Sequence, residues 1–271
     1  MSIPAVILKE IDELIRLAEA AIPANPASAD NEKLEKRYAD IMAEYFRQLE
    51  HGFPYGQLDV IYNKYSKVAE AMPVATLAGD SDEFMDYLLT AFRARLLADL
   101  IGRHVAVYLS GSAEVMTWGV TKMGIPIAYE GPPIQAAIKY AREHCAQFVT
   151  EMDEKTKKLL AQTIADGIEN KRGIDGLARD IRKQFEDMTR TRAQVIARTE
   201  TADALSQSFL DRAEDMGITG KEWIVAEPCE ICQGNSDEGI VPIDHIFSGG
   251  VDRPPQHPNC RCALAPSMLK E

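Results

Sequence analysis

The sequence has no long apolar run. No stretch of its 271 residues approaches the roughly 18 consecutive apolar residues that a membrane-spanning helix needs. Lys9 and Glu10 interrupt the first apolar stretch too early for the core of a secretory signal. We therefore expect no membrane association and no export by a cleaved signal. The compartment that this expectation leaves is a reducing cytoplasm.

The sequence also lacks the short motifs of the common enzyme classes. It contains no Walker loop, no Gly-x-Gly-x-x-Gly loop, no His-Glu-x-x-His and no Gly-x-Ser-x-Gly. The run Pro228-Cys229-x-x-Cys232 matches half of the zinc deaminase signature. However, none of the five histidines is followed two residues later by the glutamate which that site requires. No catalytic residue is therefore predicted.

The chain as a whole carries no excess of positive charge. With 30 Lys and Arg against 42 Asp and Glu, the net charge is −12, so any contact with nucleic acid has to be local. The segment from Lys155 to Arg198 differs, because it contains eleven basic and six acidic residues. This segment is either a solvated helix face or a patch that meets phosphate or an acidic partner. The predicted nucleic-acid contacts are Lys171, Arg172, Arg182, Lys183 and Arg190.

What the sequence does have is apolar residues at helical spacing. Stripes at i, i+4 and i+7 recur through most of the chain and stop at proline or glycine, as helices do. They predict a mainly α protein whose core contains most of the striped residues. The predicted helices cover residues 7–22, 34–49, 58–72, 82–108, 134–168, 177–185 and 190–216.

Glycine and proline are dense between residues 109 and 133, which predicts loops or short strands and a domain boundary. We therefore expect a helical N-terminal region at 1–130 and a second, helical domain at 131–271. After Gly220 the helical spacing ends, and Trp223-Ile224-Val225 predicts a short strand.

Cysteine is rare except near the C-terminus. Cys145 stands alone in a helical pattern and is expected in the core, whereas the other four cysteines fall in the last 43 residues. Cys-x2-Cys brings two thiolates to one ion, and tetrahedral zinc requires two further sulfur or imidazole ligands. We predict a structural zinc ion, with unmetallated thiols or a disulfide as the alternatives. The five candidates for its four ligand positions are Cys229, Cys232, His257, Cys260 and Cys262.

Several short motifs follow one another in the C-terminal half. Ile196-Ala197-Arg198-Thr199-Glu200 precedes Lys221-Glu222-Trp223, the Cys229/Cys232 pair and the ending Pro254-Pro255-x-His257-Pro258-Asn259-Cys260-Arg261-Cys262. In order and spacing these motifs are similar to those of the phage Mu F-like minor head protein family, whose members are also called phage head morphogenesis proteins. The resemblance covers about residues 130 to 266.

The resemblance implies a fold and a function. The fold is a helical head-morphogenesis domain that ends in a small Cys/His-containing β element at 223–266. The function is that of a minor capsid protein of a tailed phage or prophage, acting at the portal vertex in procapsid assembly and in DNA packaging or delivery. Such a protein is not an enzyme. It assembles in the host cytoplasm and is then part of the virion, in the capsid interior at the portal vertex. Its implied partners are the portal protein, the scaffold or major capsid protein, and DNA, with no membrane.

An enzymatic alternative stays open, namely an HNH-like zinc-containing nuclease that acts on DNA. The order Cys-x2-Cys, Asp244-His245-Ile246, Gly249-Gly250 and Asn259 resembles that of such nucleases. In them the histidine activates water and a metal ion holds the scissile phosphate. The chain departs from this pattern by Cys-x-Cys in place of a second Cys-x2-Cys, and by the lack of His or Asn after Cys262.

Arg198 and Glu200 belong to a polar triplet on a predicted helix, flanked by Ile196 and Ala202. We predict that they form a structural clamp, with hydrogen bonds to the loop of the C-terminal element. A catalytic Arg/Glu pair is the alternative, but no nucleophile or cofactor loop accompanies it.

The N-terminal region, 1–130, is predicted to dock on the portal. Docking affinity comes from a few buried anchors, and aromatic residues are frequent among them. The aromatic residues of these helices are either such anchors or internal core, and they are Tyr38, Tyr45, Phe46, Tyr62 and Tyr65.

Overall fold

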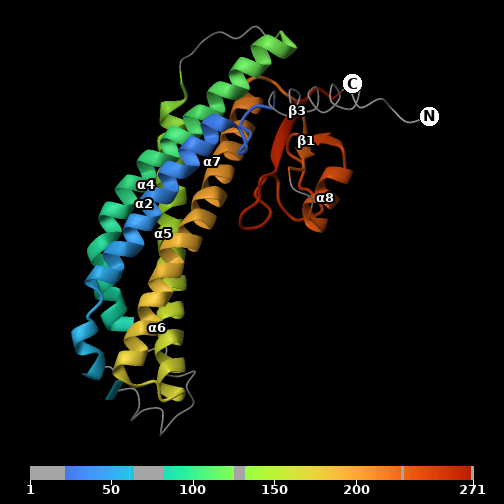
Figure 1. Cartoon of the computed structure of the whole chain (residues 1–271). Coiled ribbons are helices and arrows are strands. Elements are labelled where there is room, and N and C mark those ends of the chain that lie inside the picture. The colour runs from blue at the N-terminus through green and yellow to red at the C-terminus, as the bar shows by residue number, and fades with distance from the viewer. Residues whose placement is uncertain (1–21, 61, 64–81, 125–131, 227–228, 270–271) are drawn as a thin grey trace, which may run out of the picture. The chain divides into compact units, whose positions relative to one another are not determined.

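The computed structural model describes residues 22–60, 62–63, 82–124, 132–226 and 229–269. Helix dominates these residues, and a small antiparallel sheet lies near the C-terminus, which confirms the predicted mainly α fold with a small β element (Figure 1). The long helices are α2 (Ala29–Gly52), α4 (Asp82–Trp118), α5 (Ile134–Glu169), α6 (Gly173–Asp187) and α7 (Ala193–Asp215). The helices predicted at 7–22 and 58–72 lie largely outside the described residues.

Helix α4 continues through part of the glycine-rich region for which the sequence predicted loops. It reaches Trp118 and passes into a π-helical turn, Gly119–Met123. A Cβ atom at Gly111 would lie 2.2 Å from Oγ of Ser208 and 3.1 Å from Cδ2 of Leu205, both on α7. Gly111 therefore serves the close approach of α4 to α7. The prediction of loops or strands is wrong up to residue 123, because this packing outweighs the low helix propensity of glycine.

The chain forms two compact units, each built from separate segments. One unit consists of residues 1–38, 103–139 and 195–271, and the other of residues 39–102 and 140–194. The divisions fall within helices α2, α4, α5 and α7. The predicted domain division at residue 130 stays a prediction.

Polar contacts tie the start of α2 to α4 within the unit that holds the C-terminal residues. Glu114 of α4 accepts a hydrogen bond from the backbone N–H of Ala24 at 2.8 Å and another from Nδ2 of Asn31 at 3.1 Å. Tyr108 of α4 donates a hydrogen bond to Asp211 of α7. These contacts satisfy polar groups near buried apolar surface, and the one between Tyr108 and Asp211 joins segments on the two sides of residue 130.

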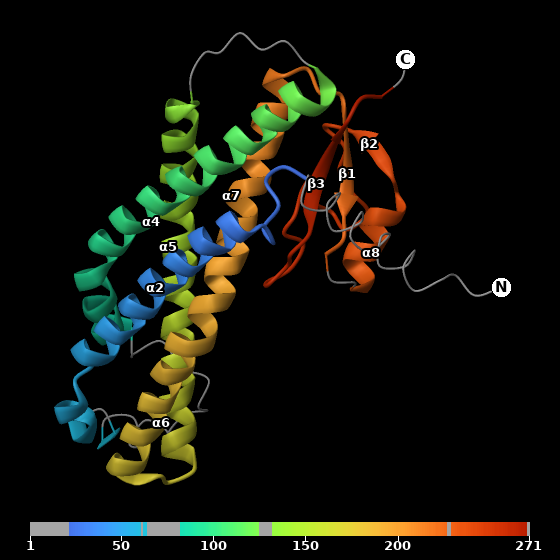
Figure 2. The same cartoon turned by 45° about the horizontal axis from the view of Figure 1, so that its top comes forward.

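The same unit contains the sheet, whose strands are ordered β2-β1-β3 (Figure 2). Helix α8 (Glu230–Asp237) lies in the chain between β1 (Gly220–Ile224) and β2 (Ile240–Pro242), and β3 (Ala263–Ser267) follows after a long loop. Both neighbours of β1 are antiparallel to it: Lys221 pairs with Val241 in β2, and Trp223 with Leu264 in β3. These four residues are all buried and share one face of the sheet, since side chains alternate along a strand.

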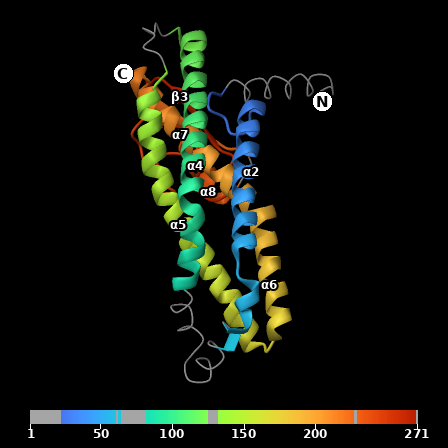
Figure 3. The same ribbon diagram turned by 90° about the vertical axis from the view of Figure 1, so that its left-hand side faces the viewer.

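The second unit has a buried carboxylate in its core. Asp153 of α5 is 0% exposed and accepts hydrogen bonds from the hydroxyl of Tyr45 at 2.9 Å and from Nε of Arg93 at 2.7 Å. Nearby, Phe53 and Phe185 meet edge-to-face where the C-terminal half of α2 lies beside α6 (Figure 3). Because a buried charge is tolerated only when it is paired, Asp153 makes the positions of α2, α4 and α5 in this unit interdependent.

Three of the proposed docking anchors are core residues. Tyr38, Tyr45 and Phe46 are 1%, 3% and 0% exposed, so they are not available to a partner. Tyr62 is half-buried, and Tyr65 lies outside the described residues. No helix in the described part of the chain is long and apolar enough to cross a bilayer.

We predict that Asp153→Ala lowers the free energy of unfolding by about 3 kcal/mol, because Tyr45 and Arg93 lose their common acceptor. Asp86→Ala is the control, since Asp86 is an exposed partner of Lys157 and its loss should cost less than about 1 kcal/mol. Urea unfolding followed by circular dichroism measures both. Equal losses in the two variants would contradict the structural role of Asp153.

Candidate metal centre

The first cysteine pair is placed by the start of helix α8. Cys229 has an extended backbone and occupies the N-cap position, where its Sγ accepts a hydrogen bond from the backbone N–H of Cys232 at 3.4 Å. The helix turn that follows carries the side chain of Cys232 back toward that of Cys229. This is the local geometry by which Cys-x2-Cys presents two sulfurs to one ion.

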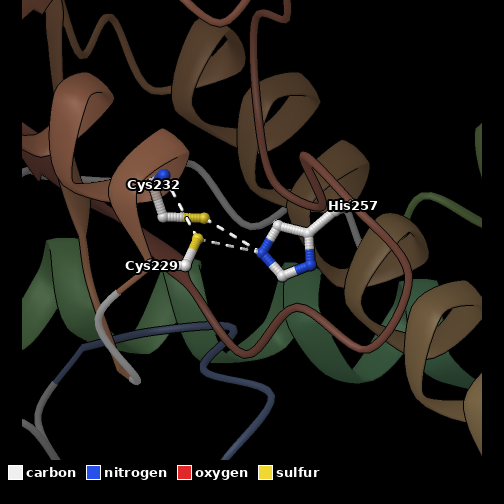
Figure 4. Close-up of side chains that lie close together, drawn as sticks. All are labelled: Cys229, Cys232 and His257. Atoms are coloured by element: carbon white, nitrogen blue, oxygen red, sulfur yellow. Dashed lines mark hydrogen bonds between the residues drawn. The ribbon is translucent and has the colours of Figure 1, made fainter.

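All five predicted ligand candidates converge around Cys232. Figure 4 shows the imidazole of His257 pointing at the two sulfurs, with Nε2 lying 3.3 Å from Sγ of Cys229 and 3.3 Å from Sγ of Cys232. From the other side, Sγ of Cys260 lies 3.9 Å from Sγ of Cys232. The ligand atoms of Cys232, Cys260 and Cys262 lie within 4.8 Å of one another, as do those of Cys229, Cys232 and His257.

The imidazole of His257 is oriented by its own backbone. Its Nδ1 lies 2.9 Å from the carbonyl oxygen of Pro258 and donates a proton to it in one tautomer. In that tautomer Nε2 carries the lone pair that faces the sulfurs. A backbone carbonyl in this position is the usual second contact of a metal-binding histidine. The same hydrogen bond raises the pKa of His257.

The four thiols differ in acidity. The backbone N–H of Cys232 lowers the pKa of Cys229, while burial raises the pKa of Cys232 to about 12. A hydrogen bond from Cys262 lowers the pKa of Cys260 to about 5, and the reciprocal contact raises the pKa of Cys262. Of the four thiols in the cluster, those of Cys229 and Cys260 are thus the ones whose pKa is lowered.

Three contacts within the cluster are as short as the edges of a tetrahedral zinc site. Bonds of about 2.3 Å to sulfur and about 2.0 Å to nitrogen place two sulfurs about 3.8 Å apart, and sulfur and nitrogen about 3.5 Å apart. The separation of 3.9 Å between Cys232 and Cys260, and those of 3.3 Å from His257, agree with these edges. The side chains can therefore hold a metal ion.

Polar contacts order the loop between β2 and the cluster. Glu238, just after α8, lies 2.7 Å from Nε2 of His245 and accepts the backbone N–H of Ser248 at 2.7 Å. The Ser248 N–H is the main reason that the pKa of Glu238 is lowered. The buried Asn235 accepts the backbone N–H of Gly249 at 2.9 Å. His245, the candidate nuclease histidine, is thus engaged with Glu238, and among the described residues it belongs to none of the close His/Cys/Asp/Glu groups.

A buried lysine binds the backbone of the same loop at Asp252. Lys221 of β1 is 0% exposed, and its Nζ donates a hydrogen bond to the carbonyl oxygen of Asp252 at 2.7 Å. It also lies 5.4 Å from the ring centroid of Phe247, which contacts Trp223 edge-to-face. Burial lowers the pKa of Lys221. The loop therefore satisfies the buried ammonium group with a backbone oxygen and an aromatic face.

The clamp contacts reach the loop from helix α7. Nη1 of Arg198 donates to Oδ1 of Asn259 at 2.6 Å, and the backbone N–H of Asn259 donates to Oγ1 of Thr199 at 3.0 Å. Asn259 has a positive φ of 68°, a conformation that asparagine tolerates better than most residues. Glu200, the other predicted clamp residue, lies 3.4 Å from the buried His104, and its part in the clamp stays a prediction.

Glu35 of α2 completes the clamp, and sequence reasoning missed it. Its carboxylate lies 3.0 Å from Nη1 of Arg261 and 3.5 Å from Nε of Arg198. Arg261 also donates to the carbonyl oxygen of Pro26 at 3.0 Å. Glu35 lies 163 positions before Arg198, and nothing in its own neighbourhood of the sequence marks it. Asn259 was visible only as a member of the C-terminal motif.

The predicted nucleic-acid contacts do not share one environment. Arg172 forms two hydrogen bonds of 2.8 Å with Asp180, and Lys171 is exposed in the turn before α6 with a positive φ of 51°. Arg182 stacks on Tyr55, with its guanidinium carbon 4.3 Å from the ring centroid. The two remaining members of the set are Lys183 and Arg190, both exposed.

We predict that Glu35→Ala destabilises the protein by about 3 kcal/mol, because two largely buried guanidinium groups, those of Arg198 and Arg261, lose their carboxylate. Glu32→Ala, at an exposed position of the same helix, should cost less than about 1 kcal/mol. Hydrogen exchange should also speed up at residues 257–262 in the first variant alone. If exchange there is unchanged, Glu35 does not support the loop.

The comparisons with known proteins bear on this same region. The family described as Phage Mu protein F like protein matches residues 154–265. The matched segment runs from α5 to β3 and contains Arg198, Asn259 and all five cluster residues. No curated protein and no solved structure matched the chain. The match lies inside the range of the resemblance and supports a phage head morphogenesis protein. The match over residues 154–265 thus supports the resemblance to the Phage Mu protein F-like family that the motifs predicted.

Proposed function

We propose that the chain is a minor head protein of a tailed phage or prophage, which acts at the portal vertex in procapsid assembly and supports DNA packaging or delivery. The observation that carries the proposal is the family match over residues 154–265. In the virion the protein lies in the capsid interior at the portal vertex. It meets the portal protein there, and the scaffold or major capsid protein during assembly in the host cytoplasm.

The proposed role is structural. The polar groups that a hydrolase would need near a metal are already committed to folding the C-terminal element. His245 pairs with Glu238, Asn235 accepts a loop N–H, and Lys221 donates to the carbonyl of Asp252. A closed set of thiol and imidazole ligands is typical of a structural metal, whereas a catalytic zinc keeps an open ligand position.

We assign the metal of this element as zinc, with Cys229, Cys232, His257 and Cys260 as its ligands. Three contacts among these four are as short as the edges of a tetrahedron, namely those of His257 with Cys229 and Cys232 and that of Cys232 with Cys260. Cys260 forms a close group with Cys232 and Cys262 but not with Cys229 and His257, so the assignment requires Cys260 to move toward those two when the metal binds. Cys262 lies behind the set and acts through its hydrogen bond to Cys260. Soft sulfur ligands favour zinc over magnesium or calcium.

Zinc in this position ties the clamp to the element. Asn259 and Arg261 flank the ligand Cys260, so a metal bond at Cys260 also holds the two residues that contact Arg198, Thr199 and Glu35. The strands of the element have only three to five residues, and such short strands form a weak sheet by themselves. Metal binding therefore contributes directly to the folding of this part of the chain.

The N-terminal region, 1–130, is proposed to dock on the portal. Because Tyr38, Tyr45 and Phe46 are internal, the docking contacts come from the exposed face of this region. The hydrogen bond from Tyr108 to Asp211 joins the parts of the chain before and after residue 130. A fragment that ends at residue 130 would lose it, so experiments should use the full chain.

Protein expressed in the cytoplasm should contain about one zinc per chain by elemental analysis. Cys232→Ser and Cys260→Ser should lose the metal and lower the melting temperature, because three ligands bind zinc far more weakly than four. Cys262→Ser should keep it. Cys145→Ala, which changes a buried cysteine of α5, is the control for loss of a thiol elsewhere. Zinc-free wild-type protein that melts like the zinc-loaded form would contradict the assignment.

Cross-linking with an amine-reactive reagent tests the portal contact. In complexes isolated with the cognate portal protein, Lys33 and Lys36 on the exposed face of α2 should cross-link to portal. The exposed Lys155 and Lys158 of α5 are the comparison and should link less. Links from α5 alone would move the docking surface to the second half of the chain, and failure to co-purify would remove the portal as a partner.

A further inference from the structure

A groove rich in positive charge lies within the unit formed by residues 39–102 and 140–194. It has a volume of about 430 Å³ and runs between the C-terminal half of α2, helix α6 and the π-helical turn Met188–Arg192. Its lining residues are Arg47, Glu50, Arg179, Arg182, Lys183, Glu186, Thr189 and Arg190. Five cations against two carboxylates give the groove an excess of three positive charges, in a chain whose net charge is −12.

The cations of the groove are only partly neutralised. Arg190 meets Glu186 at 3.3 Å, and Arg47 pairs with Glu44. Arg179 and Lys183 are exposed and form no ion pair within the described part of the chain. Exposed pairs such as Arg190–Glu186 are weak and exchange readily for another anion.

Two further features favour an anion with several acceptor oxygens. Oγ1 of Thr189 is buried at the groove and has no hydrogen-bond partner among the described residues. Arg182 is held over the ring of Tyr55, which leaves the N–H edge of its planar guanidinium fork free to meet oxygens. Phosphate groups match a hydroxyl donor and guanidinium forks better than carboxylates of protein side chains do, because each phosphate presents more acceptor oxygens.

The groove differs from the set of basic residues that the sequence singled out. Arg172 is bound to Asp180 and lines a neighbouring cavity together with Asp166, Asp187 and Lys183, the last of which also lines the groove. That neighbourhood is acidic and unsuited to phosphate. Arg47, which lies outside the basic segment 155–198, and Arg179, which lies within it, both line the groove.

We propose that this groove binds the phosphate backbone of duplex DNA without sequence preference. The inference rests on the proposed function for DNA as the source of the phosphates, while the groove itself stands on its own geometry. The lining offers guanidinium, ammonium and hydroxyl donors along a surface path, and backbone contacts of this kind position DNA without reading bases. The acidic remainder of the chain confines the contact to this groove.

The test is binding of the full-length, folded protein to a labelled duplex of mixed sequence at several salt concentrations. Five phosphate contacts predict a slope of log K against log salt of about −4 to −5, which is a loss of several hundred-fold between about 50 mM and about 200 mM salt. Arg179→Gln/Lys183→Gln should weaken binding by tenfold or more at low salt and reduce the slope by about 2. Thr189→Val should weaken binding with little change in slope.

Matched controls separate the groove from general charge. Lys155→Gln/Lys158→Gln removes the same charge from exposed positions on α5, and Lys171→Gln tests the sequence-selected residue outside the groove. Both should bind DNA like the wild type. Inorganic phosphate at the ionic strength of the salt series should compete no better than chloride, since a single phosphate fills only part of the groove.

Absence of DNA binding at low salt, or an equal loss in the groove and α5 variants, overturns the proposal. So does binding of inorganic phosphate with full competition against DNA, which would make the groove a site for a free anion. Association with portal is measured separately by co-purification. A groove variant that still co-purifies with portal but does not bind DNA supports this inference, and failure of wild-type DNA binding with portal association intact contradicts it alone.

Discussion

The convergence of Cys229, His257 and Cys260 on the buried Cys232 constrains the whole C-terminal element. Contacts of 3.3 Å from His257 to Cys229 and Cys232, and of 3.9 Å between Cys232 and Cys260, bring the start of α8 against the loop before β3. Around this contact the element has strands of only three to five residues, too few to bury a core of ordinary size. The position of Asn259 therefore follows from the cluster, since Asn259 directly precedes Cys260 in the chain.

Elsewhere the element is held by hydrogen bonds of three polar side chains, of which Lys221 and Asn235 are buried. Lys221 reaches a backbone carbonyl, Asn235 accepts a loop N–H, and Glu238 meets both His245 and the N–H of Ser248. Burying such groups without partners would cost several kcal/mol each, so the satisfied network specifies one loop conformation.

In the basic segment, a position among positive residues in the sequence does not predict which cations lie together in the structure. Along the chain, Lys171, Arg172 and Lys183 look equivalent, because each lies in a run of positive residues. In space Asp180 neutralises Arg172, whereas Arg47 from α2 joins Lys183 in one groove. An anion is bound by cations that share one surface. Here the packing of α2 against α6 brings those cations together.

The sequence by itself determined the helical character, the Cys/His composition of the last element and the resemblance to the Mu F-like family. Each of these is local or depends on motif order: helix stripes repeat within a few residues, and Cys-x2-Cys is a property of one turn. Only the tertiary structure decided the role of Gly111, which permits two helices to approach, and of Glu35, which pairs with Arg198 and Arg261. Contacts between residues more than a hundred positions apart are set by packing of whole elements, and no pattern in the neighbourhood of either residue encodes them.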